Sequence, residues 1–223
     1  MIGRNIMKNT RILFTMFICC LMMLFMGCDE VYYNLDNETI YTIPGKVVTL
    51  DISGGVDVAV DSTLAQNKVL VLSNTDDFSK LVVKEENGTL EIYDKRSIGN
   101  KVYKVYVPVL NYETLVVSGG SDFEWDGCSV EKISVIASGG ADCEMNGRCG
   151  SLSVVASGGA DVDMEHLIAE DVAVVASGGS DVSVHAAGTI SVTASGGSDI
   201  YIAGNPRISG WKVSGGADVH VER

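Results

Sequence analysis

The sequence predicts an all-β protein, a single-stranded parallel β-helix with coils of about 19–20 residues and an irregular β-rich N-terminal part. One observation behind this prediction is a pentapeptide, Ser-Gly-Gly-Ala/Ser-Asp, that recurs at spacings of 20, 19, 20, 18 and 19 residues. The other is the alternation of apolar and polar residues on both sides of the copies, which is typical of strands. The copies begin at Ser118, Ser138, Ser157, Ser177, Ser195 and Ser214, and an outlying Ser-Gly-Gly-Val-Asp begins at Ser53.

Each repeat is interpreted as two strands joined by a Gly-Gly corner and followed by a variable turn. Glycine suits the corner because it adopts a positive φ and lets neighbouring coils approach closely. Equivalent strands one repeat apart would pair in parallel at about 4.8 Å, which stacks identical columns. Such connections are nearly always right-handed, so we expect a right-handed helix. The apolar columns include Leu115, Val135, Val154, Val174, Val192 and Trp211 before the corner, and Phe123, Cys143, Val162, Val182, Ile200 and Val219 after it.

Residues 1–27 have the features of a secretion signal. Three basic residues precede an apolar run from Ile12 to Met26, which is shorter than a membrane-spanning helix requires. Gly27-Cys28 then resembles the lipobox of bacterial lipoproteins, which implies that Cys28 is lipidated and becomes the mature N-terminus. Ordinary cleavage nearby, with Cys28 unmodified, is the alternative.

The rest of the chain is interpreted as a tether and one β-helix domain, because no linker separates the irregular part from the repeats. The Asn87-Gly88 pair predicts a tight hairpin turn in the irregular part, which therefore mixes antiparallel pairing into the first turns and cap. The predicted boundaries are 1–27 for the signal peptide, 28–44 for the tether, and 45–223 for the domain, with irregular first turns at 45–113 and regular repeats at 114–223.

The chain is strongly acidic, with 29 Asp and Glu against 16 Lys and Arg and a formal net charge of −13. Removal of the signal takes away three positive charges and no negative one, so the mature chain would carry −16. This charge disfavours nucleic acid and anionic membrane surfaces as partners. It leaves cations, basic proteins and neutral glycans as ligand classes, with membrane attachment through the N-terminal lipid only.

Three cysteines follow Cys28. Cys143 falls in an inward column, where a thiol packs as a small apolar group. Cys128 and Cys149 fall in the turns of consecutive coils, 21 residues apart, and export permits a disulfide between them. Both alternatives, a disulfide and two free thiols, remain open. The two turns differ in length, and their alignment decides whether the cysteines meet.

The best candidate site is the aspartate ladder, formed by the last residue of each pentapeptide on the outer face beside the corner. Neighbouring carboxylates about 5 Å apart repel by about 0.8 kcal/mol in water. A structural role is the favoured interpretation, in which each carboxylate accepts a hydrogen bond from a corner N–H or a serine hydroxyl. Divalent cation binding between adjacent carboxylates is the alternative. The ladder comprises Asp122, Asp142, Asp161, Asp181, Asp199 and Asp218.

The sequence shows no catalytic constellation. His166, His185 and His220 come from different coil positions and share no spacing. There is no nucleophile elbow, and the Gly-rich repeats open strands instead of helices, so no phosphate-binding loop is expected. Basic residues are few in the repeats, which disfavours a polysaccharide-cleaving β-helix enzyme. We therefore predict no enzymatic activity, no cofactor and no assigned metal.

The far end of the repeats raises the prospect of self-association. Arg223 follows the last inward residue, Val221, by two positions. The end of a solenoid exposes strand edges and core side chains, which normally need covering. We therefore expect that another subunit covers this C-terminal end. The alternative is that the flanking residues cover it themselves.

With a lipobox, a β-rich lead-in and coils marked by Ser-Gly-Gly-Ala/Ser-Asp, residues 45–222 resemble the putative autotransporter-adhesin head GIN domain family. The resemblance implies an exported bacterial β-helix that serves as a surface binding or adhesion module, and it supplies no catalytic residues. We expect an outer-membrane lipoprotein at the cell surface or on the periplasmic face, with an unknown glycan or protein ligand. A periplasm-facing envelope structural or assembly protein is the first alternative, and a polysaccharide-active enzyme is the second.

Overall fold

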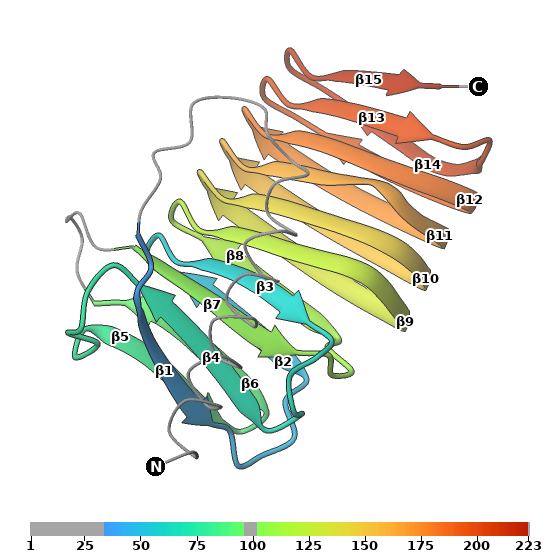
Figure 1. Ribbon diagram of the computed structural model, residues 1–223. Helices are drawn as coiled ribbons and strands as arrows, with labels where there is room; N and C mark the ends of the chain where they lie inside the picture. Colours follow the sequence, from blue (N-terminus) through green and yellow to red (C-terminus); the bar gives the residue numbers. More distant parts are fainter. Residues whose placement is uncertain (1–33, 96–101, 223) are drawn as a thin grey trace, which may run out of the picture. The chain divides into compact units, whose positions relative to one another are not determined.

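The computed structural model describes residues 34–95 and 102–222, and every regular element within them is a strand. The 15 strands belong to one hydrogen-bonded sheet that winds into a flattened parallel β-solenoid (Figure 1). The predicted fold class is therefore confirmed. The predicted signal peptide and the predicted lipidation site Cys28 lie outside the described residues. Within the described ranges, no helix is long and apolar enough to span a membrane.

The repeats stack in register, as the sequence predicts. Val154 of one coil lies beside Val135 of the coil before and Val174 of the coil after, and the strands pair in parallel. The strands of the repeats are β8 (Thr114–Ser118), β9 (Asp122–Gly139), β10 (Asp142–Gly158), β11 (Asp161–Gly178), β12 (Asp181–Ala194), β13 (Asp199–Ala203), β14 (Arg207–Val213) and β15 (Asp218–Val221).

The predicted variable turns between the repeats are instead bent strand. Each of the long strands β9, β10, β11 and β12 runs from its aspartate around the bend and back toward the next corner. Where consecutive repeats differ in length, the pairing between their strands shifts register. Such shifts occur between Met145 and Gly147 and between Met164 and Ile168. Bulges of this kind keep the backbone paired while redirecting side chains.

The N-terminal part supplies the first coils in an order that the sequence does not show. The corner Gly54-Gly55 joins β2 to β3, and these strands pair with β8 and β9. The later strands β6 and β7 lie on the other side of β2 and β3, so a later segment stacks outside an earlier one. The strands are β1 (Asn37–Thr42), β2 (Thr49–Ser53), β3 (Asp57–Asp61), β4 (Lys68–Ser73), β5 (Leu81–Glu86), β6 (Thr89–Asp94) and β7 (Tyr103–Pro108).

Antiparallel strands complete this end, as expected. β4 pairs with β7, β1 pairs with β4, and β5 forms a hairpin with β6 across Asn87-Gly88. Both turn residues have positive φ, 53° and 82°, which confirms the predicted tight turn. The predicted tether at 28–44 needs correction, because residues 37–42 are β1: their alternation suits a half-buried strand, and β4 offers a free edge to pair with.

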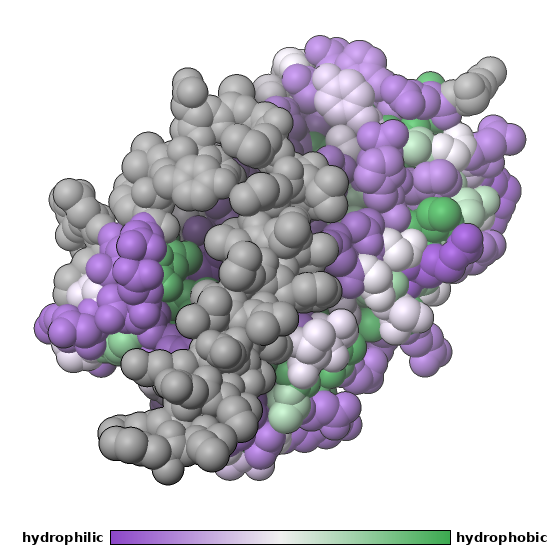
Figure 2. Space-filling view, viewed as in Figure 1, coloured by the Kyte–Doolittle hydropathy of each residue, from purple (hydrophilic) through white to green (hydrophobic). Residues whose placement is uncertain are grey.

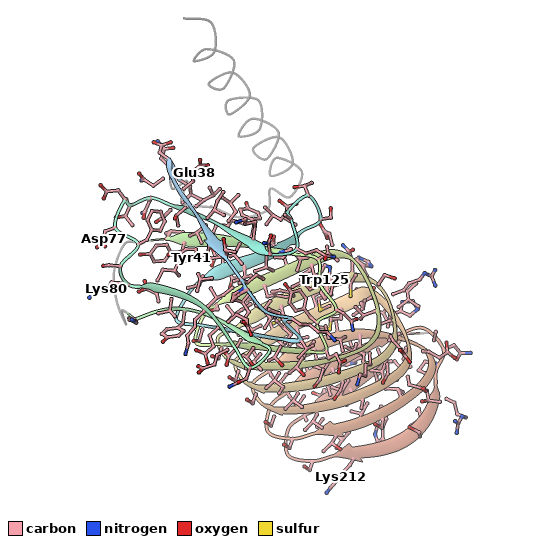
Figure 3. All side chains as sticks on the ribbon, turned by 90° about the horizontal axis from the view of Figure 1, so that it is seen from below. Glu38, Tyr41, Asp77, Lys80, Trp125 and Lys212 are labelled. Carbon is pink, nitrogen blue, oxygen red and sulfur yellow. The ribbon has the colours of Figure 1, made fainter. Side chains whose placement is uncertain are left out.

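The core lies between the two sides of the solenoid and is filled by the predicted columns, except in the last coil, where Trp211 is exposed and Val219 is only partly buried. The core includes an edge-to-face contact between Tyr112 and Trp125, whose ring centroids are 5.7 Å apart. The Tyr112 hydroxyl donates a hydrogen bond of 2.9 Å to the Pro108 carbonyl, which satisfies it inside the core. Figure 3 shows Trp125 among the strands and Lys212 pointing away from the far end.

The Gly-Gly corners stack backbone on backbone. Gly178 has a φ of +82°, and a Cβ there would lie 2.8 Å from the Gly158 carbonyl oxygen of the preceding coil. The N–H of Gly179 donates to that same oxygen at 2.7 Å. The predicted reason for glycine, a positive φ together with close approach, is therefore confirmed at this corner.

Candidate functional site

One side of the solenoid carries a continuous acidic surface, which we call the acidic face. It consists of the outward side chains of β15, β13 and the first halves of β9 to β12. Figure 2 shows mainly hydrophilic residues over β13 and β15, where this surface is in view. Equivalent outward positions of consecutive coils form three rows on this face, and the rows contain carboxylates and no lysine or arginine. The first row is the aspartate ladder; the second is Glu124, Glu144, Asp163, Ser183, Tyr201 and His220; the third is Asp126, Asn146, Glu165, His185, Ala203 and Glu222.

The structure brings the six predicted aspartates together in one parallel register. Consecutive members are direct cross-strand partners, from Asp122 with Asp142 to Asp199 with Asp218. The outlying copy adds a member that sequence reasoning missed: Asp57 in β3 precedes Asp122, because Val58 pairs with Phe123. The sequence contains a signal for this member, because Asp57 ends the Ser-Gly-Gly-Val-Asp that begins at Ser53. It does not indicate that β3 stacks on β9.

Burial and, after it, neighbouring carboxylates raise the pKa of several of these carboxyl groups. Burial is the main cause at Asp122, with Asp57, Asp142 and Glu124 adding repulsion and Lys104 opposing it, and together they raise its pKa to about 6. Burial first, and then neighbouring carboxylates, also raise the pKa of Asp161 and Glu144. Part of the acidic face therefore binds protons more readily than isolated carboxylates do.

The hydrogen bonds expected to support the ladder are not the ones that form. Among the described residues, no hydrogen bond reaches the carboxylate of a predicted ladder aspartate. The corner N–H groups bond to carbonyls of the neighbouring coil, and the Ser180 hydroxyl donates to Ser177 O at 3.2 Å. In the first corner, Ser121 Oγ accepts from Gly55 N and Val56 N, both at 3.1 Å. The corner N–H groups and Ser121 join neighbouring coils, the Ser180 hydroxyl bonds within its own corner, and the aspartates point outward.

The alternative role of the aspartate ladder, binding of a divalent cation, has no set of metal ligands among the described residues. Among residues 34–95 and 102–222, no group of three or more His, Cys, Asp or Glu side chains is arranged to hold a metal ion. His166, His185 and His220 occupy different positions, and His185 pairs across the strands with Ala203 while His220 pairs with Tyr201.

Of the two alternatives left open for Cys128 and Cys149, the structure contains the free thiols: both are free and buried, as is that of Cys143. The reason is register: Cys128 pairs with Gly147 and Cys149 pairs with Val130, so the two cysteines are offset along the bend. Burial is the main reason that the pKa of the Cys128 thiol rises to about 12 and that of Cys149 to about 11.

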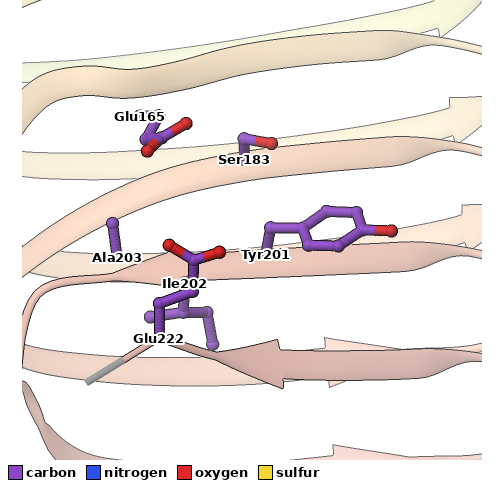
Figure 4. A pocket seen from close by; sticks show the side chains of 6 residues that line it. All are labelled: Glu165, Ser183, Tyr201, Ile202, Ala203 and Glu222. Carbon is purple, nitrogen blue, oxygen red and sulfur yellow. The ribbon is translucent and has the colours of Figure 1, made fainter.

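The acidic face also contains a hollow that sequence reasoning missed. It has a volume of about 240 Å³, lies at the C-terminal end of the face, and is shown in Figure 4. The Tyr201 ring beside it stacks on the ring of His220, with centroids 5.0 Å apart and planes 17° apart. Two features of the sequence could have indicated the hollow. The second row changes from acidic residues to Ser183 and Tyr201, and the repeat that begins at Ser177 has only 18 residues. The lining residues are Glu165, Ser183, Tyr201, Ile202, Ala203 and Glu222.

Comparison with solved structures places the fold among bacterial proteins described as adhesins. A putative adhesin from Bacteroides fragilis superimposes with a TM-score of 0.67 at 15% identity, covering 83% of this chain and 96% of that chain. A putative lipid binding protein from Parabacteroides distasonis has a TM-score of 0.48 at 16% identity, covering 84% and 96%. A putative adhesin from Parabacteroides merdae has a TM-score of 0.47 at 12% identity, also covering 84% and 96%.

A search of curated proteins gave no match. A family profile, in contrast, matches residues 48–206, which is most of the solenoid and includes five of the six regular corners. The family is described as "Putative auto-transporter adhesin, head GIN domain". This agrees with the resemblance carried by the repeated pentapeptide, and the chain belongs to this family.

Proposed function

We propose that the mature chain is a non-catalytic, lipid-anchored module of the bacterial outer membrane that binds a partner at the cell surface. The observation that carries this proposal is the acidic face, an exposed and repetitive surface formed by in-register rows on a rigid solenoid. Binding surfaces are more precise when regular strands hold them than when loops do. Membership of an adhesin-like family supports an exported binding role.

The chemistry of this face favours binding over catalysis. Its first row, the aspartate ladder, repeats one carboxylate in every coil. A nucleophile, a base and an orienting group within hydrogen-bond reach are what acyl or glycosyl transfer needs. The three described histidines lie at different coil positions, and the thiols are buried with raised pKa values. These features support a recognition role.

The anchor in the proposal is Cys28, because Gly27-Cys28 resembles a lipobox. Replacement of Cys28 by Ser should release the protein from the membrane fraction, whereas replacement of Cys143 by Ser should leave it membrane-bound. Metabolic labelling with a fatty-acid analogue distinguishes the two variants. Membrane retention and labelling of the Cys28→Ser variant would contradict lipid anchoring at this residue.

Surface exposure is tested by protease and antibody accessibility of a tagged protein on intact cells, with lysed cells as the control. Labelling of intact cells is the expected result. Protection until lysis would exclude the surface role. It would instead favour the second candidate, a periplasm-facing assembly protein, for which the apolar side chains exposed on the last coil provide a specific observation.

A further inference from the structure

The hollow at the end of the acidic face owes its existence to a local change in coil length. β11 has 18 residues and β12 has 14, and the register between them shifts from Met164 to Ile168. Glu165 lies in the skipped segment, so the bulge turns its side chain toward the coils that follow. Ser183 and Ala203 are small, and they leave the space that larger side chains fill elsewhere on the face.

The walls of the hollow combine an aromatic ring with two carboxylates. Figure 4 shows the side chains of Glu165 and Glu222 at one end of the hollow and the ring of Tyr201 at the other. Tyr201 is 44% exposed, and its stacking on His220 fixes the ring in place. Glu165 and Glu222 are exposed, and among the described residues neither has an ion-pair partner.

This combination is suited to a cation. A guanidinium or ammonium group is attracted to the face of a tyrosine ring and forms short, charge-assisted hydrogen bonds with carboxylates. The three rows of the face contain no lysine or arginine that would compete for the site. The aspartate ladder adjoins the hollow and adds a negative potential that raises the local concentration of cationic ligands.

We propose that the hollow is a binding site for an arginine or lysine side chain of a basic segment in a partner protein. The neighbouring basic residues of that segment would lie over the aspartate ladder. This inference rests on the proposed binding function and gives it a ligand class. A basic protein segment is favoured over a neutral glycan because only a cation gains from both the two carboxylates of the hollow and the charge of the whole face.

The test uses the full chain purified in neutral detergent and titrated by calorimetry with an acetylated, amidated tetra-arginine peptide. We expect binding that weakens as salt is added. The Tyr201→Ala variant and the Glu165→Gln/Glu222→Gln double variant should each lower the affinity by about tenfold. The matched control is Glu131→Gln/Glu170→Gln, which removes the same charge outside the three rows and should change the affinity by less than about twofold.

Each other outcome overturns the inference. No binding of the peptide removes the site, and an equal loss in the control shows binding to net charge alone. Maltohexaose serves as the neutral probe: if it binds, and Tyr201→Ala abolishes its binding while the peptide does not bind, the hollow is a sugar site. All three variants must keep the wild-type melting temperature. Surface labelling of intact cells reports the proposed function independently, so the two can fail separately.

Discussion

At the scale of single residues, the two glycines of one corner have different reasons to be glycine. The first, Gly178, has positive φ and its missing Cβ would lie 2.8 Å from a backbone oxygen. The second, Gly179, has no positive φ, and its Cβ would lie 3.8 Å from the same oxygen, which is ordinary contact. The pentapeptide therefore repeats one strict glycine and one more tolerant one at this corner.

We expect Gly178→Ala to lower the free energy of unfolding by about 2 kcal/mol or more, because a side chain there meets both backbone strain and a clash. Gly179→Ala, the matched control, should cost less than about 0.5 kcal/mol. Urea unfolding of both variants at one pH measures the difference. Equal costs would show that the corner is held by something other than the φ and close approach of Gly178.

At the scale of elements, the aspartate ladder stores electrostatic repulsion along β9, β10 and β11. Asp122 has Asp57 on one side and Asp142 on the other, and both add to the rise in its pKa that burial mainly causes. The solenoid tolerates this repulsion because the coils are joined by backbone hydrogen bonds and by the apolar columns, neither of which involves the carboxylates.

The ladder predicts that the protein is more stable in mild acid than at neutral pH. The pKa of Asp122 is about 6 in the folded protein against an ordinary value of 3.8, so the folded state holds the proton more tightly. The associated stabilisation is complete below the ordinary pKa and is lost as the pH rises through about 6. We expect a higher melting temperature at about pH 5 than at about pH 7.5.

Asp122→Asn should raise the melting temperature at about pH 7.5 and reduce its dependence on pH. Asp76→Asn, which removes an exposed carboxylate outside the acidic face, is the control and should leave the pH profile unchanged. Scanning calorimetry across this pH range gives both results. A melting temperature that rises steadily from acid to neutral pH would contradict the raised pKa of Asp122.

At the scale of the whole molecule, the two ends of the described solenoid differ. The N-terminal coils are bordered by the antiparallel strands β1, β4 and β5. In the last coil, positions that are buried in every earlier coil become exposed: Trp211 is 46% exposed, Val213 37% and Val221 39%. Apolar side chains beside strand edges are features of surfaces that associate.

Self-association through this coil therefore stays a prediction, now tied to particular side chains. We expect sedimentation velocity of the full chain in detergent to show a concentration-dependent increase in mass. Trp211→Ser should weaken it, because this replacement removes the largest exposed apolar side chain of the coil. Ile40→Ser on β1, where the isoleucine is 62% exposed, should have no effect. A monomer at every concentration would remove the prediction.

The sequence by itself determined the repeating architecture. Periodic glycines and alternating columns specify parallel coils in register, because each coil buries its apolar residues only against an identical neighbour. It therefore predicted the aspartate ladder and the Asn87-Gly88 turn. Both features depend on residues that are adjacent in the sequence, so a local pattern is enough to predict them.

Only the tertiary structure decided which coils meet and how unequal coils fit together. The stacking of β3 on β9, which adds Asp57 to the ladder, depends on contacts between distant segments. The register offset between Cys128 and Cys149 and the bulge at Glu165, beside the hollow, both arise where repeats of different length must remain paired. No local pattern encodes such adjustments, because they minimise the energy of a pair of coils and not of either coil alone.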